Sequence, residues 1–167
     1  MAFPDDLLEQ AFHLAARERT KPKQASLRRS VSTAYYALFH LLTLDAASNW
    51  KRAEQRDRVA RIFEHGKMRS ACTRKASELR NDLKLNRPTG ETLRRSANLL
   101  LVAETFAGAQ QRRHAADYDN TVTWSRSEAL NQISSVANAF EAWRDVRNQP
   151  DAQALLVAFF GGREPAR

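Results

Sequence analysis

The chain has 167 residues, the size of a single domain, and 43% of them are hydrophobic, which is enough for a packed core. Only five Gly and five Pro occur, so collagen-like and low-complexity architectures are excluded. No apolar run approaches the roughly 18 to 20 residues of a membrane span, and the N-terminus does not resemble a signal peptide. A single cysteine, Cys72, cannot form an internal disulfide, so we expect a cytoplasmic protein. One cysteine and four histidines lack zinc-finger spacing, and we expect no metal and no cofactor.

Positive charge is concentrated in the middle of the chain. The net charge is +8, and residues 51–95 hold 14 Lys/Arg against 6 Asp/Glu, whereas the remainder holds 13 of each. This asymmetry indicates an anionic partner such as nucleic acid, a nucleotide or another phosphate-bearing ligand. The alternative is a solvated, arginine-rich surface. Few aromatic residues interleave with these charges, so a stacking platform for single strands is not favoured.

The first half of the chain predicts helices. Pro4, Asp5 and Asp6 are typical of a helix start, and this helix is expected to run to about Arg19. The next helix has a continuous apolar stripe over four turns, and its width predicts neighbours on more than one side. The stripe is Leu27, Val31, Ala34, Leu38 and Leu41. Residues 53–85 are polar and favourable to helix, with Gly66 as a point of division, and 86–90 form the clearest loop.

Three further helices are expected in the second half. Thr89 can cap a helix that runs to Tyr118, and two adjacent apolar stripes predict that this helix is deeply buried. Ser125 and Glu128 form a capping-box pattern, and an amphipathic helix follows to about residue 148. A short last helix begins near Pro150 and ends at residues 161–162. The fold class is therefore all-α, an antiparallel bundle of five to six helices, with one domain over 1–162 and a tail over 163–167.

Residues 112–119 are the strongest candidate for chemistry. Arg113 and Asp117 are four apart and share a helix face, and His114 and Asp117 are three apart, as a base and its orienting carboxylate can be. Arg113 and His114 also supply two kinds of N–H group that can donate hydrogen bonds to a phosphate. The alternative is a helix C-terminus with an i, i+4 ion pair.

Two weaker candidates lie in the basic segment. Arg58 and His65, on one helix, could hold and cleave a phosphodiester, with Arg58 binding the phosphoryl oxygens and His65 moving a proton. Cys72 lies among Arg69, Arg74 and Lys75, which could lower the pKa of its thiol. Both patterns also arise by chance in a chain this rich in arginine.

One motif resembles a known family. Residues 34–40 read A-Y-Y-A-L-F-H, and this stretch resembles the second helix of HEPN domains, the "higher eukaryotes and prokaryotes nucleotide-binding" family. His65 to Lys67 and Arg112 to Asp119 resemble later stretches of that family, and order and spacing agree over residues 25–145. The same motif also suits plain core and dimer packing, in which case His40 is a partly buried histidine.

The resemblance implies a helical bundle that dimerises, often beside a nucleotidyltransferase in toxin–antitoxin pairs. Several members are metal-independent RNases with an R-x4–6-H motif. This chain departs from that motif. Four intervening residues after Arg113 lead to Tyr118, where the motif has a histidine, and His114 follows the arginine directly.

The leading hypothesis is a HEPN-like homodimer that binds RNA or a nucleotide and has no membrane partner. Catalytic candidates are Arg113, His114 and Asp117, and candidate binding residues are Arg112, Arg113, Tyr118, His65, Lys67 and His40. The alternatives are a metal-independent endoribonuclease, or a non-catalytic subunit that partners a nucleotidyltransferase or an antitoxin.

Overall fold

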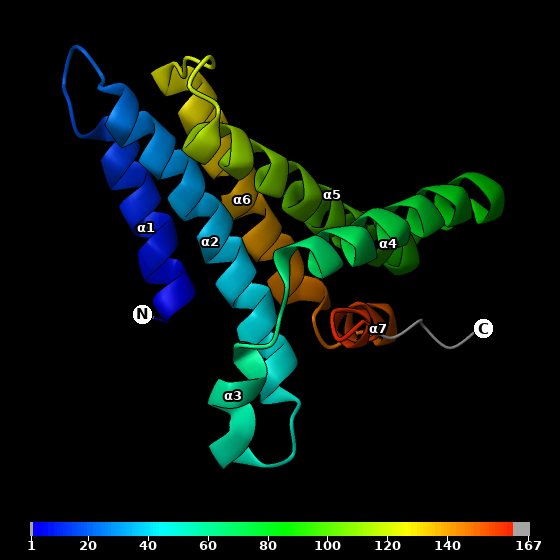
Figure 1. Ribbon diagram of the computed structural model, residues 1–167. Helices are drawn as coiled ribbons and strands as arrows, with labels where there is room; N and C mark the ends of the chain where they lie inside the picture. The colour runs from blue at the N-terminus through cyan, green and yellow to red at the C-terminus, as the bar shows by residue number, and fades with distance from the viewer. Residues whose placement is uncertain (1, 162–167) are drawn as a thin grey trace.

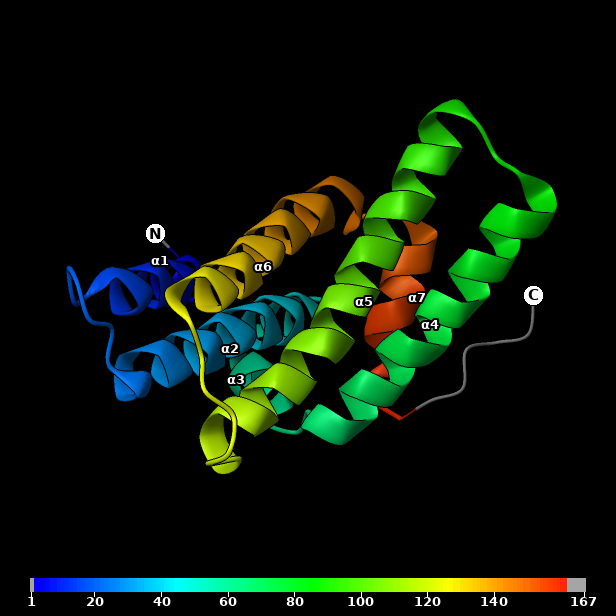
Figure 2. The same ribbon diagram turned by 90° about the horizontal axis from the view of Figure 1, so that it is seen from above.

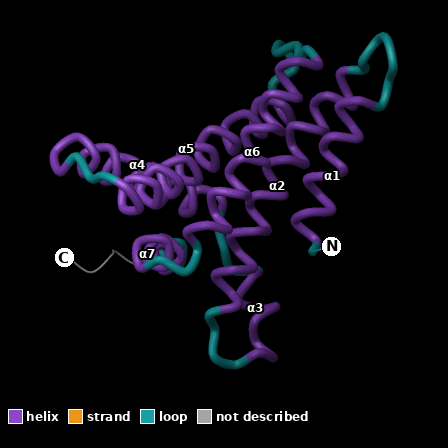
Figure 3. The backbone as a smooth tube through the Cα atoms, turned by 180° about the vertical axis from the view of Figure 1, so that it is seen from behind, coloured by secondary structure: helices purple, strands orange, loops and turns teal. Residues whose placement is uncertain are grey.

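The computed structural model describes residues 2–161, and within them every regular element is helical (Figure 3). The elements are α1 (Phe3–Ala16), α2 (Gln24–Ser48), a 3₁₀ turn η1 (Ala53–Gln55), α3 (Arg56–Ala60), α4 (His65–Asn86), α5 (Gly90–Tyr118), α6 (Arg126–Val146) and α7 (Pro150–Ala158). The all-α prediction is confirmed. The expected five to six helices become seven over the described range, and the predicted tail at 163–167 lies outside it.

Helix α2 is the centre of the molecule. Of its 25 residues, 16 are buried, and Leu27, Tyr35 and Leu38 are completely inaccessible. Helices α1, α5 and α6 pack against it along its length, while α3 and α7 contact it near its C-terminal end (Figures 1 and 2). The broad apolar stripe of α2 therefore predicted its many neighbours correctly.

Helices α4 and α5 form an antiparallel hairpin that extends away from α1 (Figure 2). The C-terminal half of α5 packs in the main body, whereas its N-terminal half and most of α4 project from it, with α7 alongside α4 (Figure 1). The prediction that α5 is deeply buried was wrong for its first turns, because Leu93 is 44% exposed. Burial along α5 follows the single stripe of Leu99, Val102, Ala103, Phe106, Ala109, Arg113 and Ala116.

The helix boundaries show which local signals act. The Ser125–Glu128 capping box forms as predicted at the start of α6. Thr89 occupies the N-cap of α5 without a side-chain hydrogen bond, and α1 ends at Ala16, three residues earlier than expected. The break in the 53–85 segment falls between Ala60 and His65, whereas Gly66 lies inside the first turn of α4. No described helix combines the length and apolarity needed to cross a membrane.

Arg28 ties α2 to the far end of α5. Its Nη1 donates to the carbonyls of Ala116 and Asp119, both at 2.9 Å, and its Nη2 donates to the carbonyl of Val122 at 2.5 Å. These acceptors include carbonyls at the C-terminus of α5, where a cation also offsets the negative end of the helix dipole. One side chain thus fixes the end of the helix that carries residues 112–118.

We predict that Arg28→Ala lowers the free energy of unfolding by about 2 kcal/mol, because it removes charge-assisted hydrogen bonds to three carbonyls. The matched control is Arg29→Ala, which makes the same change at an exposed neighbouring position and is expected to stay within about 0.5 kcal/mol of wild type. Urea denaturation of both variants measures the difference. Equal losses in the two variants would contradict this role for Arg28.

Candidate functional site

Polar and aromatic side chains gather where α2, the start of α4 and the end of α5 meet. We call this group the Arg113 cluster; it consists of Tyr35, Tyr36 and His40 from α2, His65 from α4, and Arg113 and Asp117 from α5. The helical spacing of Tyr36 and His40, and of Arg113 and Asp117, puts each pair on one helix face. Three segments that are distant in sequence therefore supply one site.

Arg113 is the buried cation of the cluster. The residue is 9% exposed, and its guanidinium carbon lies 5.4 Å from the centre of the Tyr35 ring and 5.8 Å from that of Tyr36. These contacts are cation–π interactions. Its Nε is buried and has no hydrogen-bond acceptor among the described residues. A guanidinium carries five N–H donors, and Nε is sealed from solvent, so any acceptor ligand would have to use the remaining donors of this 9% exposed residue.

Asp117 neutralises Arg113 only in part. Its Oδ2 lies 3.6 Å from Arg113 Nη1, beyond hydrogen-bonding distance, and it accepts a hydrogen bond of 3.2 Å from the Ser32 hydroxyl. The Asp117 side chain is 25% exposed, so water weakens its attraction for the guanidinium. The predicted pairing of Arg113 with Asp117 is thus present as a loose ion pair.

His65 is held by an aromatic cage. Its Nδ1 is 2.5 Å from the Tyr35 hydroxyl, and its ring centre is 4.3 Å from that of Phe39. Burial lowers the pKa of His65, and the positive charge of Arg113 and then His40 lower it further. Burial also lowers the pKa of His40, whose ring lies 5.0 Å from that of Phe3. Both histidines are therefore biased towards the neutral form.

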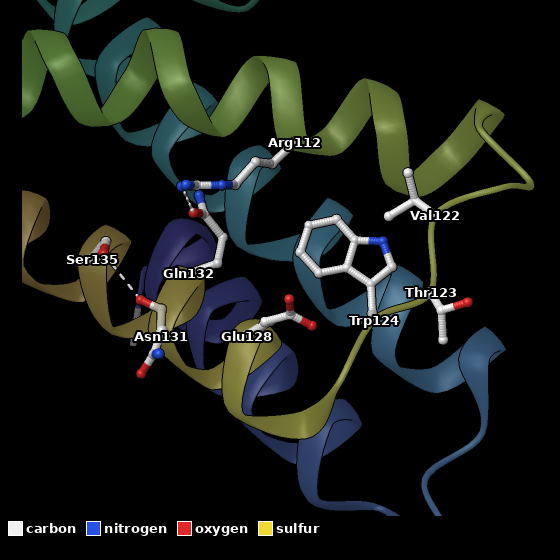
Figure 4. A pocket seen from close by; sticks show the side chains of 8 residues that line it. All are labelled: Arg112, Val122, Thr123, Trp124, Glu128, Asn131, Gln132 and Ser135. Carbon is white, nitrogen blue, oxygen red and sulfur yellow. Dashed lines mark hydrogen bonds between the residues drawn. The ribbon is translucent and has the colours of Figure 1, made fainter.

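The other predicted site residues lie apart from this cluster. Arg112 donates to Gln132 on α6 at 2.6 Å and lines a separate pocket of about 380 Å³ with Trp124 (Figure 4). The exposed His114 contacts the Tyr118 ring in a tilted arrangement, with ring centres 5.0 Å apart, while Asp117 accepts from Ser32. The predicted pairing of His114 with Asp117 is therefore not formed. Lys67 is exposed and pairs with Glu64 at 2.6 Å.

Two predictions from the basic segment were wrong. Arg58 and His65 do not share a helix, because α3 ends at Ala60 and α4 begins at His65. The Cys72 thiol is fully buried, and burial raises its pKa instead of the expected lowering by neighbouring cations. The Cys72 side chain packs in the core, so the loss of hydration outweighs any effect of the cationic residues that neighbour it in the sequence.

Three residues close to the site were not predicted as site residues from the sequence: Ser32, Tyr35 and Tyr36. Ser32, Tyr36 and His40 are each four apart and so follow one face of α2, a spacing that could have identified them. Tyr35 could not be separated from the core residues of the same helix, because it is completely buried even though its ring and hydroxyl contact Arg113 and His65.

The described residues contain no group of three or more His, Cys, Asp or Glu that could hold a metal ion. Comparisons with protein-family models, with curated proteins and with solved structures each found no match.

We predict that acidification below about pH 6.5 destabilises the protein. The folded-state pKa values of His40 and His65 are depressed, so the unfolded chain, with ordinary histidine pKa values near 6.5, binds more protons. The stabilisation is complete above the unfolded pKa and is lost as the pH falls below it. Urea unfolding at pH 7.5 and pH 5.5 measures it, and equal or greater stability at pH 5.5 would contradict the assignment.

Proposed function

We propose that the protein is a HEPN-like helical protein that binds RNA or a nucleotide through the Arg113 cluster. The observation that carries this proposal is Arg113 itself, a buried guanidinium with an unpaired Nε and a carboxylate too distant for a hydrogen bond. Keeping a cation in this state costs stability, and a ligand that accepts from the donors other than the sealed Nε would offset part of that cost. A phosphate oxygen is an acceptor that a guanidinium binds with high geometric specificity.

A separate open groove on the hairpin, between α4 and α5, supports a polynucleotide over a free nucleotide. It has a volume of about 710 Å³, and one of its lining residues, Gly66, follows His65 in the chain. Arginines and hydroxyl groups, the side chains that commonly contact a sugar–phosphate backbone, dominate its lining. The lining residues are Gly66, Arg69, Ser70, Thr73, Arg74, Ser77 and Gln110.

The charge distribution supports the same ligand class. Residues 51–95, which carry the net positive charge, include α3, α4 and the start of α5, and most of them lie in the projecting hairpin (Figure 2). Some of these cations are neutralised by ion pairs, as Arg80 is by Glu104 and Arg95 by Glu91. The remaining excess provides long-range attraction for a polyanion.

The biological setting follows from the sequence resemblance and forms part of this proposal. In that setting the protein acts as a homodimer in a toxin–antitoxin or defence system, with a nucleotidyltransferase or an antitoxin as protein partner. The A-Y-Y-A-L-F-H motif, on which the resemblance depends, supports this setting, because three of its residues, Tyr35, Tyr36 and His40, belong to the Arg113 cluster. Tyr118 and His114, exposed at the end of α5, are available for contacts beyond the cluster.

We predict that Arg113→Met weakens binding of a single-stranded oligoribonucleotide at least tenfold without lowering the thermal midpoint. The substitution removes the N–H donors that bind phosphate, and the apolar side chain relieves the cost of burying a cation that is only loosely paired with Asp117. Fluorescence anisotropy measures affinity, and circular dichroism measures the midpoint. Wild-type affinity should also fall more than about tenfold between 50 and 200 mM salt.

Arg17→Met is the matched control, since it removes the same charge from an exposed position at the end of α1. It should reduce the affinity much less than Arg113→Met. Equal losses in the two variants would show that only net charge matters and would contradict a site at Arg113.

A second function, metal-independent RNA cleavage, is favoured by one observation. The structure puts His65 close enough to Arg113 for the arginine to depress its pKa, whereas His114 faces Tyr118. A phosphodiester held by Arg113 would thus have His65 nearby for proton transfer. The missing R-x4–6-H histidine would then be supplied by α4 and not by α5.

For this second function we predict cleavage of an oligoribonucleotide in EDTA, with a loss of about 10²-fold or more in His65→Ala and a rate near that of wild type in His114→Ala. Gel analysis of purified, folded protein measures the rates. Intact RNA with the wild-type protein, or equal rates in wild type and His65→Ala, would exclude it.

A further inference from the structure

The hydrogen bond between Tyr35 and His65 can be made in two ways. The Tyr35 hydroxyl can donate to Nδ1, which leaves the proton of a neutral imidazole on Nε2, or Nδ1–H can donate to the phenol oxygen, which leaves Nε2 unprotonated. The two arrangements give His65 opposite roles. In the first it offers an N–H donor to a ligand, and in the second it offers a base.

The surroundings of the Tyr35 hydroxyl distinguish the two arrangements. Tyr35 is completely buried, and among the described residues His65 Nδ1 is the hydrogen-bond partner of its hydroxyl. If Nδ1–H donated, the phenol proton would be left in the interior without an acceptor, which folded proteins avoid. Burial also raises the pKa of Tyr35, so the phenol keeps this proton. Donation from Tyr35 to His65 satisfies both groups with one hydrogen bond.

We propose that Tyr35 is a positioning residue that fixes His65 as the neutral tautomer with its proton on Nε2, so that His65 and Arg113 both present N–H donors to the ligand. Nε2 has no partner among the described residues, and it is not among the nitrogens that are sealed from solvent. The identity of the ligand rests on the proposed function, but the tautomer does not.

The charges that face His65 are consistent with a neutral donor. Helix α2 presents His40 and Tyr35, and α5 presents Arg113, with Asp117 beyond it. Two charged residues lie next to His65 in the chain, Lys67 in α4 and Glu64 at the N-cap of α4, and they pair with each other. A second cation directly beside Arg113 would be unfavourable, so the site gains its second donor without a second positive charge.

This arrangement defines the ligand class more closely. Arg113 and a Nε2-protonated His65 can only donate, so the site is complementary to a fully deprotonated phosphate oxygen that only accepts. A protonated Nε2 cannot remove a proton from a ribose hydroxyl. In this resting state the cluster is built for binding, which favours the proposed function over RNA cleavage.

The direct test is ¹⁵N NMR of the ligand-free protein labelled at its histidine imidazoles, at a pH where His65 is neutral. Resonances of His65 are assigned by their loss in His65→Gln. We expect an unprotonated Nδ1 and a protonated Nε2 in wild type, and a mixture of tautomers in Tyr35→Phe, which keeps the ring and removes the hydroxyl. A protonated Nδ1 in wild type, or an identical tautomer ratio in wild type and Tyr35→Phe, would overturn the proposal.

A pair of substitutions tests the role of Nε2 in binding. The amide nitrogen of Gln can occupy the place of Nε2 as a donor, whereas the Asn side chain is too short for its amide nitrogen to reach that place. With inorganic phosphate as the probe, we expect both variants to bind more weakly than wild type, and His65→Gln about tenfold more tightly than His65→Asn, the equivalent of one charge-assisted hydrogen bond. Equal affinities of the two variants would contradict a donor role.

The two readouts separate this inference from the proposed function. A Nε2-protonated, Tyr35-dependent tautomer in a protein that binds neither phosphate nor RNA supports the tautomer and contradicts the proposed function. RNA binding that depends on Arg113, in a protein whose His65 is protonated on Nδ1, supports the function and overturns the role of Tyr35.

Discussion

Helix α2 must be covered on nearly every side, and this requirement places the other helices. Its 16 buried residues are distributed around the whole helix, so a single partner could not shield them. Helices α1, α5 and α6 pack along it, and α3 and α7 contact it near its C-terminal end (Figure 1). The candidate site is a product of the same packing. Tyr35 belongs to the buried surface of α2, and its ring contacts Phe106 in the core while its hydroxyl contacts His65 at the edge.

In the Arg113 cluster, the buried Tyr35 lies beside a cation whose N–H donors are only partly used. Arg113 is fixed between two tyrosine rings and a carboxylate at 3.6 Å, yet its Nε has no acceptor in the described chain. Arg28, by contrast, donates to three carbonyls, whereas the buried Nε of Arg126 also has no acceptor in the described chain. Arg113 differs from both arginines because it has only a loose ion pair with Asp117 and lies in one cluster with two neutral-biased histidines. This combination has the character of a binding site, where stability is sacrificed for an acceptor from outside.

Much of the fold was predictable from local sequence signals, whereas the site was predictable only in part. The apolar stripe of α2, the capping box at Ser125 and the helix start at Pro150 all act through neighbouring residues, so periodicity and spacing identify them. Spacing also identified Arg113 with Asp117. Spacing also grouped His114 with Arg113 and Asp117. The His114 ring contacts Tyr118 instead, because adjacent residues on a helix project about 100° apart and His114 therefore points away from Arg113.

The sequence by itself determined the all-helical class, the breadth of the α2 core and the concentration of positive charge in residues 51–95. Only the tertiary structure decided that His65 belongs with Arg113, that Arg58 and Cys72 do not belong to the site, and that Arg112 faces a different pocket. The physical reason is that helix periodicity relates residues within one helix, whereas these groupings depend on how α5 packs against α2 and on where α4 begins. Which face of α5 meets α2 is fixed by the packing of the whole chain, and that packing buries Arg113 and leaves His114 exposed.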